Sequence, residues 1–151
     1  MKKHFIIIFV LAGILAFVDQ ITKIVAFEEF QTPLPIIKSF FRLSYAENTG
    51  IAFSIPIPYM ILIIVNVLLL ILIIFFTVKE LKTEKSLTKI SIALLLGGGI
   101  GNLIDRLFRG YVIDFISIWK YPSFNFADIY VTLGVILLLI FYKKIKLQRS
   151  A

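Results

Sequence analysis

Cysteine is absent from this 151-residue chain, and histidine occurs once, at His4. The lack of cysteine excludes disulfides, thiol nucleophiles and cysteine-ligated metals. A serine nucleophile usually needs a histidine as its base, and His4 stands beside Lys2 and Lys3, where a basic flank is the simpler interpretation. We therefore expect no catalytic site that is built on a thiol or on histidine.

Acidic residues are also few, nine Asp and Glu against sixteen Lys and Arg, while 60% of the chain is hydrophobic and the mean hydropathy is +0.98. The apolar residues form uninterrupted runs, such as 60–78 and 131–142, rather than amphipathic periods. This composition favours a membrane protein over a water-soluble fold. Because a membrane-spanning helix needs roughly 20 apolar residues, four of them use nearly the whole chain as a single integral membrane domain.

The hydrophobic runs predict four transmembrane helices, at residues 5–27, 58–78, 88–107 and 124–142. The first run also resembles a secretory signal peptide, but no small-residue cleavage pattern follows it, so a retained helix is expected. Between the first two helices, prolines exclude a continuous helix in 28–57, and residues 40–45 alternate like a strand. The predicted fold is all-α, with a small interfacial sheet in that segment.

Positive charges separate the two sides of the membrane. Lys and Arg are concentrated at the N-terminus, in the loop after the second helix and at the C-terminus, and these segments are predicted to be cytoplasmic. The other two loops, 28–57 and 108–123, are poorer in basic residues and are predicted to face outward. The net charge of +7 thus indicates orientation in a membrane, and nucleic acid is not an expected partner.

The four aspartates of the chain all fall at the predicted outer level. Ionisable groups at membrane depth are costly, so their convergence on one level indicates a functional site. Asp19 and Lys23 are four residues apart and can pair on one helix face, and Asp105 can pair with Arg109 in the same way. These pairs are interpreted mainly as structural charges.

Asp114 and Asp128 differ, because no cation on their own segment neutralises them. Two such carboxylates that meet in apolar surroundings would share a proton and supply one acid and one base near neutral pH. An acid and a base placed together in this way can activate water for the hydrolysis of an amide bond. Asp128 alone could instead be a charge that the N-terminus of the fourth helix favours. Gly97 and Gly101 have the spacing that allows close helix packing.

Five short motifs carry a resemblance to a known family: 19–23 (DQITK), 47–53 (ENTGIAF), 98–106 (GGIGNLIDR), 112–115 (VIDF) and 124–128 (FNFAD). In order and spacing they resemble lipoprotein signal peptidase, signal peptidase II, over nearly the whole chain. The resemblance implies that Asp114 and Asp128 form a catalytic dyad. It also implies a set of residues that bind substrate or support the site, namely Asp19, Lys23, Asn48, Gly50, Asn102, Asp105, Arg106, Asn125 and Ala127.

The same resemblance implies a half-barrel β-cradle at 28–57 on the extracytoplasmic side of a bacterial cytoplasmic membrane. The implied substrate is a diacylglyceryl-modified prolipoprotein, cut just before its lipidated cysteine, with no metal and no cofactor. Membrane lipids and cyclic-peptide inhibitors such as globomycin are the other implied partners of a monomer. We further hypothesise that Asn48, Asn102 and Asn125 hydrogen-bond an unwound substrate backbone.

Two other functions stay open at this stage. A proton-relay or transport subunit also uses intramembrane carboxylates, but it predicts acidic groups spread through the membrane thickness. A non-enzymatic assembly or anchoring protein would need only the glycine-rich packing, and it leaves the two uncompensated aspartates unexplained.

Overall fold

The computed structural model describes residues 2–50 and 58–147, and within them the chain forms four long helices. They are α1 (Lys2–Glu29), α2 (Tyr59–Glu80), α3 (Ser86–Arg109) and α4 (Phe126–Ile145). Each of the four is long and apolar enough to cross a membrane. The prediction of a mostly helical protein with four membrane-length helices is therefore confirmed.

The helix surfaces are the reverse of those in a water-soluble bundle. Large apolar side chains point outward, with Leu139 74% exposed and Phe17 66% exposed. The buried side of α1 instead carries small or charged residues, among them Ala12, Asp19 and Lys23. Lipid is as apolar as leucine, so the helices associate through close packing and polar contacts rather than through hydrophobic burial.

Helix α3 packs along both α1 and α4. Its glycines allow the close approach of these two helices. A Cβ atom added at Gly98 would collide with the carbonyl oxygen of Ala127 on α4. A Cβ atom at Gly101 would lie 2.5 Å from the Asp19 carboxylate of α1, and one at Gly97 would lie 2.7 Å from Leu15. The predicted packing role of the glycine segment is therefore borne out, and it brings α1 and α4 against the same stretch of α3.

A three-stranded antiparallel sheet in the described residues has the order β1 (Leu34–Ile37), β2 (Phe41–Asn48) and β3 (Val112–Ile118). The first two strands come from the segment predicted to contain a sheet, although its residues 51–57 lie outside the described residues. The third strand lies in the loop between α3 and α4 and was missed. Both of its faces are largely buried, so it lacks the alternation that marks a half-exposed strand.

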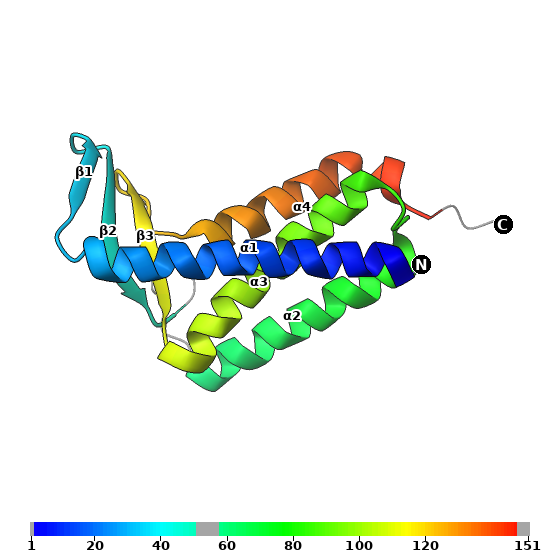
Figure 1. The fold of residues 1–151 in the computed structure, drawn as a ribbon, viewed down its shortest axis with the longest axis horizontal. Helices are drawn as coiled ribbons and strands as arrows, with labels where there is room; N and C mark the ends of the chain where they lie inside the picture. The colour runs from blue at the N-terminus through cyan, green and yellow to red at the C-terminus, as the bar shows by residue number, and fades with distance from the viewer. Residues whose placement is uncertain (1, 51–57, 148–151) are drawn as a thin grey trace.

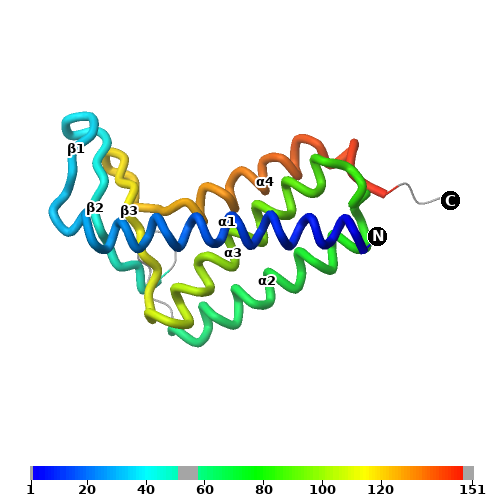
Figure 2. The backbone as a smooth tube through the Cα atoms, in the orientation of Figure 1, coloured from blue at the N-terminus to red at the C-terminus, as the bar shows by residue number. Residues whose placement is uncertain are grey.

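The sheet covers one end of the helix bundle, and its strands run across the direction of the helices (Figure 1). Both ends of the described chain lie at the opposite end of the bundle, as the backbone trace also shows (Figure 2). The last helix begins at Phe126 rather than at the predicted residue 124, because Asn125 is its N-cap. This boundary places Asp128 in the first turn of α4, at the end of that helix nearer the sheet (Figure 1).

Candidate active site

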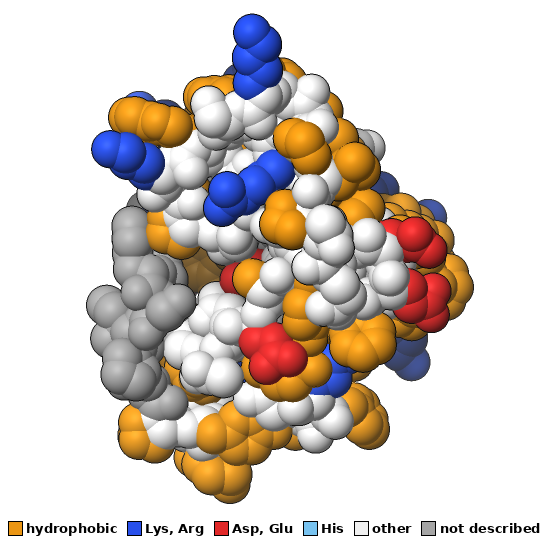
Figure 3. Space-filling model, turned by 90° about the vertical axis from the view of Figure 1, so that its left-hand side faces the viewer, with side chains coloured by type: hydrophobic (Ala, Val, Ile, Leu, Met, Phe, Trp, Pro, Cys, Tyr) orange, Lys and Arg blue, Asp and Glu red, His pale blue; other side chains and the backbone are white. Residues whose placement is uncertain are grey.

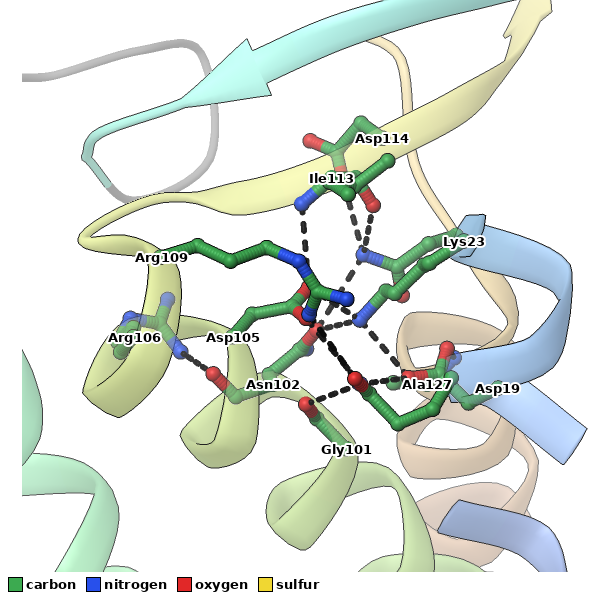
Figure 4. Close-up of polar contacts among 12 residues, drawn as sticks. Asp19, Lys23, Gly101, Asn102, Asp105, Arg106, Arg109, Ile113, Asp114 and Ala127 are labelled. Atoms are coloured by element: carbon green, nitrogen blue, oxygen red, sulfur yellow. Dashed lines mark hydrogen bonds and ion pairs between the residues drawn. The ribbon is translucent and has the colours of Figure 1, made fainter. Parts of the chain in front are cut away.

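A buried charged cluster joins α1 to α3 near the sheet. The Nζ atom of Lys23 lies 2.8 Å from an oxygen of Asp19 and 2.8 Å from an oxygen of Asp105, and all three side chains are 0% exposed. The same ammonium donates to Oδ1 of Asn102 at 3.0 Å. Figure 4 shows Lys23 reaching between these acceptors, which occupy its three donor positions. The predicted pairing of Asp19 with Lys23 is therefore present, and it is a triad rather than a pair.

Each carboxylate of this cluster also holds a backbone amide of the neighbouring structure. Oδ1 of Asp19 accepts a hydrogen bond from the Ala127 N–H at the start of α4, at 2.9 Å. Oδ2 of Asp105 accepts from the Ile113 N–H of β3 at 3.1 Å. Ala127 precedes Asp128 and Ile113 precedes Asp114, so the cluster fixes the two backbone segments that carry the predicted dyad.

Two further polar side chains complete the cluster. Arg109 forms the predicted ion pair with Asp105 and donates to Oε1 of Gln20 at 2.9 Å. Gln20 in turn donates to Oδ1 of Asp105 and to the carbonyl of Gly101, both at 3.1 Å. Sequence reasoning did not select Gln20 as a site residue. A polar residue next to Asp19 within an apolar span is the signal that could have identified it.

Asp114 on β3 is bound by side-chain amides. Asn48 on β2 donates from Nδ2 to one carboxylate oxygen at 2.9 Å, and Asn125 donates to the other at 2.7 Å. The Gly50 N–H donates to Oδ1 of Asn48 at 3.0 Å and thereby orients that amide toward Asp114. Asp114 is only 3% exposed.

Asp128 is held by a reciprocal cap at the start of α4. Its N–H donates to Oδ1 of Asn125 at 3.0 Å, and the Asn125 N–H donates to Oδ2 of Asp128 at 3.2 Å. This is a capping box, in which two backbone donors of the helix start are satisfied at once. The Nδ2 group of Asn102 donates to the other oxygen of Asp128 at 2.8 Å. Asn125 therefore binds both aspartates and links them.

The surroundings of Asp114 favour its protonated form. Burial raises the pKa of Asp114 to about 7, and the neighbouring charge of Asp128 acts in the same direction. Hydrogen bonds from Asn48 and Asn125 and the charge of Lys23 act in the opposite direction, without cancelling the effect of burial. A carboxyl with this pKa can hold or release a proton near neutral pH.

Both aspartates open onto one cavity of ≈ 600 Å³ between the sheet and the helices. Figure 3 looks onto the sheet end, where the surface is hollowed near its middle. The polar part of the lining includes Asn48, Asn102 and Arg106 beside the two carboxylates. The apolar part extends along the helices and includes Leu62, Leu69, Leu70, Ile73, Leu95 and Val131. The cavity thus combines two carboxylates with a long apolar wall.

Comparison with known families gives a match over most of the chain. The family described as signal peptidase (SPase) II matches residues 11–144. The chain belongs to the signal peptidase II family. It is accordingly a membrane peptidase, and the resemblance inferred from the five motifs is confirmed.

Named relatives and solved structures agree with this membership. A lipoprotein signal peptidase of Moorella thermoacetica is 39% identical over 130 residues, which cover 85% of this chain and 87% of the relative. One of Clostridium acetobutylicum is 41% identical over 142 residues, covering 89% and 91%. A solved bacterial membrane enzyme superimposes with a TM-score of 0.81 at 29% identity, covering 91% of this chain and 87% of that chain. A second has a TM-score of 0.79 at 30% identity and covers 91% and 92%.

All of the residues selected from the sequence lie in the cavity or in the network behind it. Asn48, Gly50, Asn102, Arg106, Asp114 and Asp128 line the cavity. Asp19, Lys23, Asp105, Asn125 and Ala127 lie behind them in the hydrogen-bonded network. The three asparagine amides that are expected to bind a substrate backbone each donate a hydrogen bond to an aspartate in this structure. Their binding of a substrate backbone stays a prediction.

Sequence reasoning missed one polar residue of α2. Asn66 lines the cavity. The two contacts of its side-chain amide assign the amide oxygen to the side of Arg106, 3.2 Å from Nη1, and the amide nitrogen to the side of the Gly99 carbonyl, at 3.3 Å. A single asparagine within the apolar run 60–78 is the signal that marks it. Asn66 therefore connects α2 to the polar part of the site.

Proposed function

We propose that this protein is an aspartyl endopeptidase that removes the signal peptide from diacylglyceryl-modified prolipoproteins, cutting just before the lipidated cysteine. Asp114 and Asp128 are its catalytic dyad, and the other residues selected above hold or orient them. The proposal is supported most directly by the link through Asn125, which binds both carboxylates at the wall of one cavity. Relatives of 39% and 41% identity are named lipoprotein signal peptidases.

The proposed chemistry divides acid and base between the two aspartates. With a pKa of about 7, Asp114 is the proton donor, and Asp128 in its ionised form accepts a proton from water. The water oxygen attacks the carbonyl carbon of the scissile amide while Asp114 protonates the carbonyl oxygen. Collapse of the tetrahedral intermediate breaks the C–N bond: the proton on Asp128 passes to the leaving nitrogen, and one hydroxyl of the intermediate returns its proton to Asp114 as the carbonyl of the new carboxyl group forms.

The shape of the cavity supports a lipid-linked substrate. Its apolar wall along α2, α3 and α4 accommodates a hydrophobic signal segment, while its polar end holds the two aspartates. The acyl chains of a lipidated cysteine stay in the hydrocarbon, so its peptide bond is presented at the level of the interface. We place this end of the molecule on the extracytoplasmic side, with both termini in the cytoplasm, from the distribution of basic residues.

Other expected partners follow from the same proposal. Membrane lipids surround the helices, and we expect a cyclic peptide such as globomycin to inhibit by occupying the cavity beside Asp114 and Asp128. We propose a monomer and chemistry without a cofactor. The alternative of a proton-relay or transport subunit is less well supported, because the aspartates of α1, α3 and α4 gather in one network at the sheet end.

The decisive test uses the full chain in detergent with a diacylglyceryl-modified prolipoprotein as substrate. Asp114→Asn and Asp128→Asn should each lower kcat by about 10²–10⁴-fold or more, because each removes one half of the acid and base pair. Glu28→Gln, which removes an exposed carboxylate of α1, should leave turnover unchanged. Equal turnover in the parent and both Asp variants, with thermal unfolding unaltered, refutes the dyad.

A further inference from the structure

Two turns lie side by side at the edge of the sheet that projects from the bundle. One joins β1 to β2 and the other follows β3. The Trp119 N–H donates to the carbonyl of Phe40 at 2.6 Å and ties the two turns together. We call Ile37, Lys38, Phe40, Trp119 and Lys120 the sheet tip.

The backbone of the sheet tip is unusual at two positions. Lys38 has φ 37° and Trp119 has φ 46°, and they are the two non-glycine residues with positive φ in the described part of the chain. Glycine or asparagine normally occupies this left-handed conformation, and a bulky residue there is a genuine outlier. If turn geometry were the only requirement, glycine would serve better. The side chains at 38 and 119 are therefore expected to have a task of their own.

The three large apolar side chains of the sheet tip are exposed. Ile37 is 55% exposed, Phe40 53% and Trp119 68%. Trp and Tyr are enriched at the membrane–water interface, where the Trp ring is buried among the lipids and its N–H hydrogen-bonds to water or headgroups. The chain has one Trp in all, and it lies here.

The charge of this region has one sign. The segments 30–46 and 115–127 contain Lys38, Arg42 and Lys120 but no Asp or Glu. The ammonium of Lys120 lies 5.4 Å from the centre of the Trp119 ring, so cation and ring face the same environment. In Figure 3 Lys and Arg side chains stand in the upper part of this face among scattered hydrophobic ones, while the acidic side chains lie lower. A surface that is both apolar and cationic complements an anionic phospholipid headgroup layer.

The position of the sheet tip brings it over lipid. The strands run across the end of the bundle, and the turns extend sideways past the start of α4 (Figures 1 and 2). The outer side of α4 carries exposed apolar residues such as Leu139 and Ile140, which face the hydrocarbon in a membrane. A projection from the end of such a bundle therefore overhangs the headgroups beside it.

We propose that the sheet tip is a membrane anchor that binds anionic phospholipid. The rings of Trp119 and Phe40 enter the interface below the headgroups, and Lys38 and Lys120 bind lipid phosphates. Because β3 carries Asp114 about five residues, or roughly 17 Å, from Trp119, the anchor also sets the height of that aspartate above the lipid. This last consequence rests on the proposed function, whereas the anchoring itself does not.

The single tryptophan allows a direct test, since all Trp fluorescence of the full-length protein reports on the sheet tip. The protein is reconstituted in vesicles of phosphatidylcholine and phosphatidylglycerol that contain lipids brominated near the headgroup end of the acyl chain. The anchor predicts strong quenching by these lipids, weaker quenching by lipids brominated near the methyl end, and protection from aqueous acrylamide. Full quenching by acrylamide with none by either brominated lipid overturns the proposal.

A pair of charge-reversed variants separates the lipid contact from a general loss of structure. Lys38→Glu with Lys120→Glu should lose most of the quenching by shallow brominated lipid and gain quenching by acrylamide, with helix content by circular dichroism unchanged. Lys79→Glu with Lys85→Glu, two exposed lysines at the opposite end of the bundle, should leave both signals as in the parent. Unchanged quenching in the first pair refutes the phosphate contact. No cleavage is measured, so the result stands whether or not the dyad is correct.

Discussion

The two groups of aspartates at the sheet end differ in what binds them. Asp19 and Asp105 are bound by the cations Lys23 and Arg109 and by backbone amides. Asp114, by contrast, takes its hydrogen bonds from the neutral amides of Asn48 and Asn125, and Asp128 is bound by Asn102 and the capping box. Asp19 and Asp105 have cationic partners and do not line the cavity, and we call them the closed group. Asp114 and Asp128 line the cavity, and we call them the open group.

In the proposed function, this difference separates the aspartates that support the site from those that carry out the chemistry. A buried carboxylate with cationic partners holds its charge and its position, which suits a group that anchors other backbone segments. A carboxylate held by neutral amides beside a second carboxylate keeps its geometry but retains freedom to bind a proton. In the proposed function the closed group acts through the open one, because its carboxylates bind the backbone beside Asp114 and Asp128.

The largest expected effect comes from breaking the closed group. Lys23→Met keeps much of the volume but leaves Asp19 and Asp105 short of their shared cation, and breaking a buried ion network costs about 3–5 kcal/mol. Thermal unfolding in detergent should show this loss together with loss of cleavage. Lys143→Met, an exposed lysine at the end of α4, is the control and should unfold like the parent. If Lys23→Met unfolds like the parent too, the closed group is not a support.

The next effect should appear in activity rather than in stability. Asn125→Ser retains an oxygen that can cap α4 but removes the amide that binds Asp114. Loss of such a preorganised donor lowers kcat by about 10²–10³-fold. Cleavage of a diacylglyceryl-modified prolipoprotein measures the effect, and the unfolding temperature serves as the check on folding. Turnover at the parental level contradicts the linking role of Asn125.

A smaller effect is expected from overpacking between α3 and α4. Gly98→Ala places a methyl group against the Ala127 carbonyl, and such overpacking costs about 1–3 kcal/mol while displacing the start of α4. Gly13→Ala is the matched control, because a Cβ atom there meets nothing within 4 Å. Thermal unfolding of the two variants compares them directly. Equal unfolding temperatures would show that the helices have room to separate.

The smallest effect is a shift in the pH profile. If the protonated form of Asp114 is the acid, kcat/KM should fall about tenfold per pH unit above roughly pH 7 as that proton is lost. Asn48→Leu removes a hydrogen bond that lowers the pKa of Asp114, so the alkaline limb should move to higher pH. The profile is measured as kcat/KM against pH in both proteins. A limb that stays in place in Asn48→Leu assigns the proton to another group.

Particular residues show how far the sequence could lead. The pairing of Asp19 with Lys23 and of Asp105 with Arg109 was predictable, because residues four apart share a helix face. The bond between Asp19 and Ala127 was not predictable, since it joins residues 108 positions apart. Strand β3 escaped detection because both its faces are buried. The bonds from the asparagine amides to the aspartates were not predictable either, because the partners lie on different elements of the chain.

By itself, the sequence determined that this protein folds in a membrane and that it has four membrane-length helices. Because the chain has only four aspartates, the sequence also indicated that each of them matters to the site. Hydrophobicity and local spacing are properties of contiguous residues, so they can be read without coordinates. Only the tertiary structure decided which aspartates receive cations and which receive amides, because those partners come from helices and strands distant in the chain. The same holds for the sheet tip, where two turns separated by about 80 residues meet through one hydrogen bond.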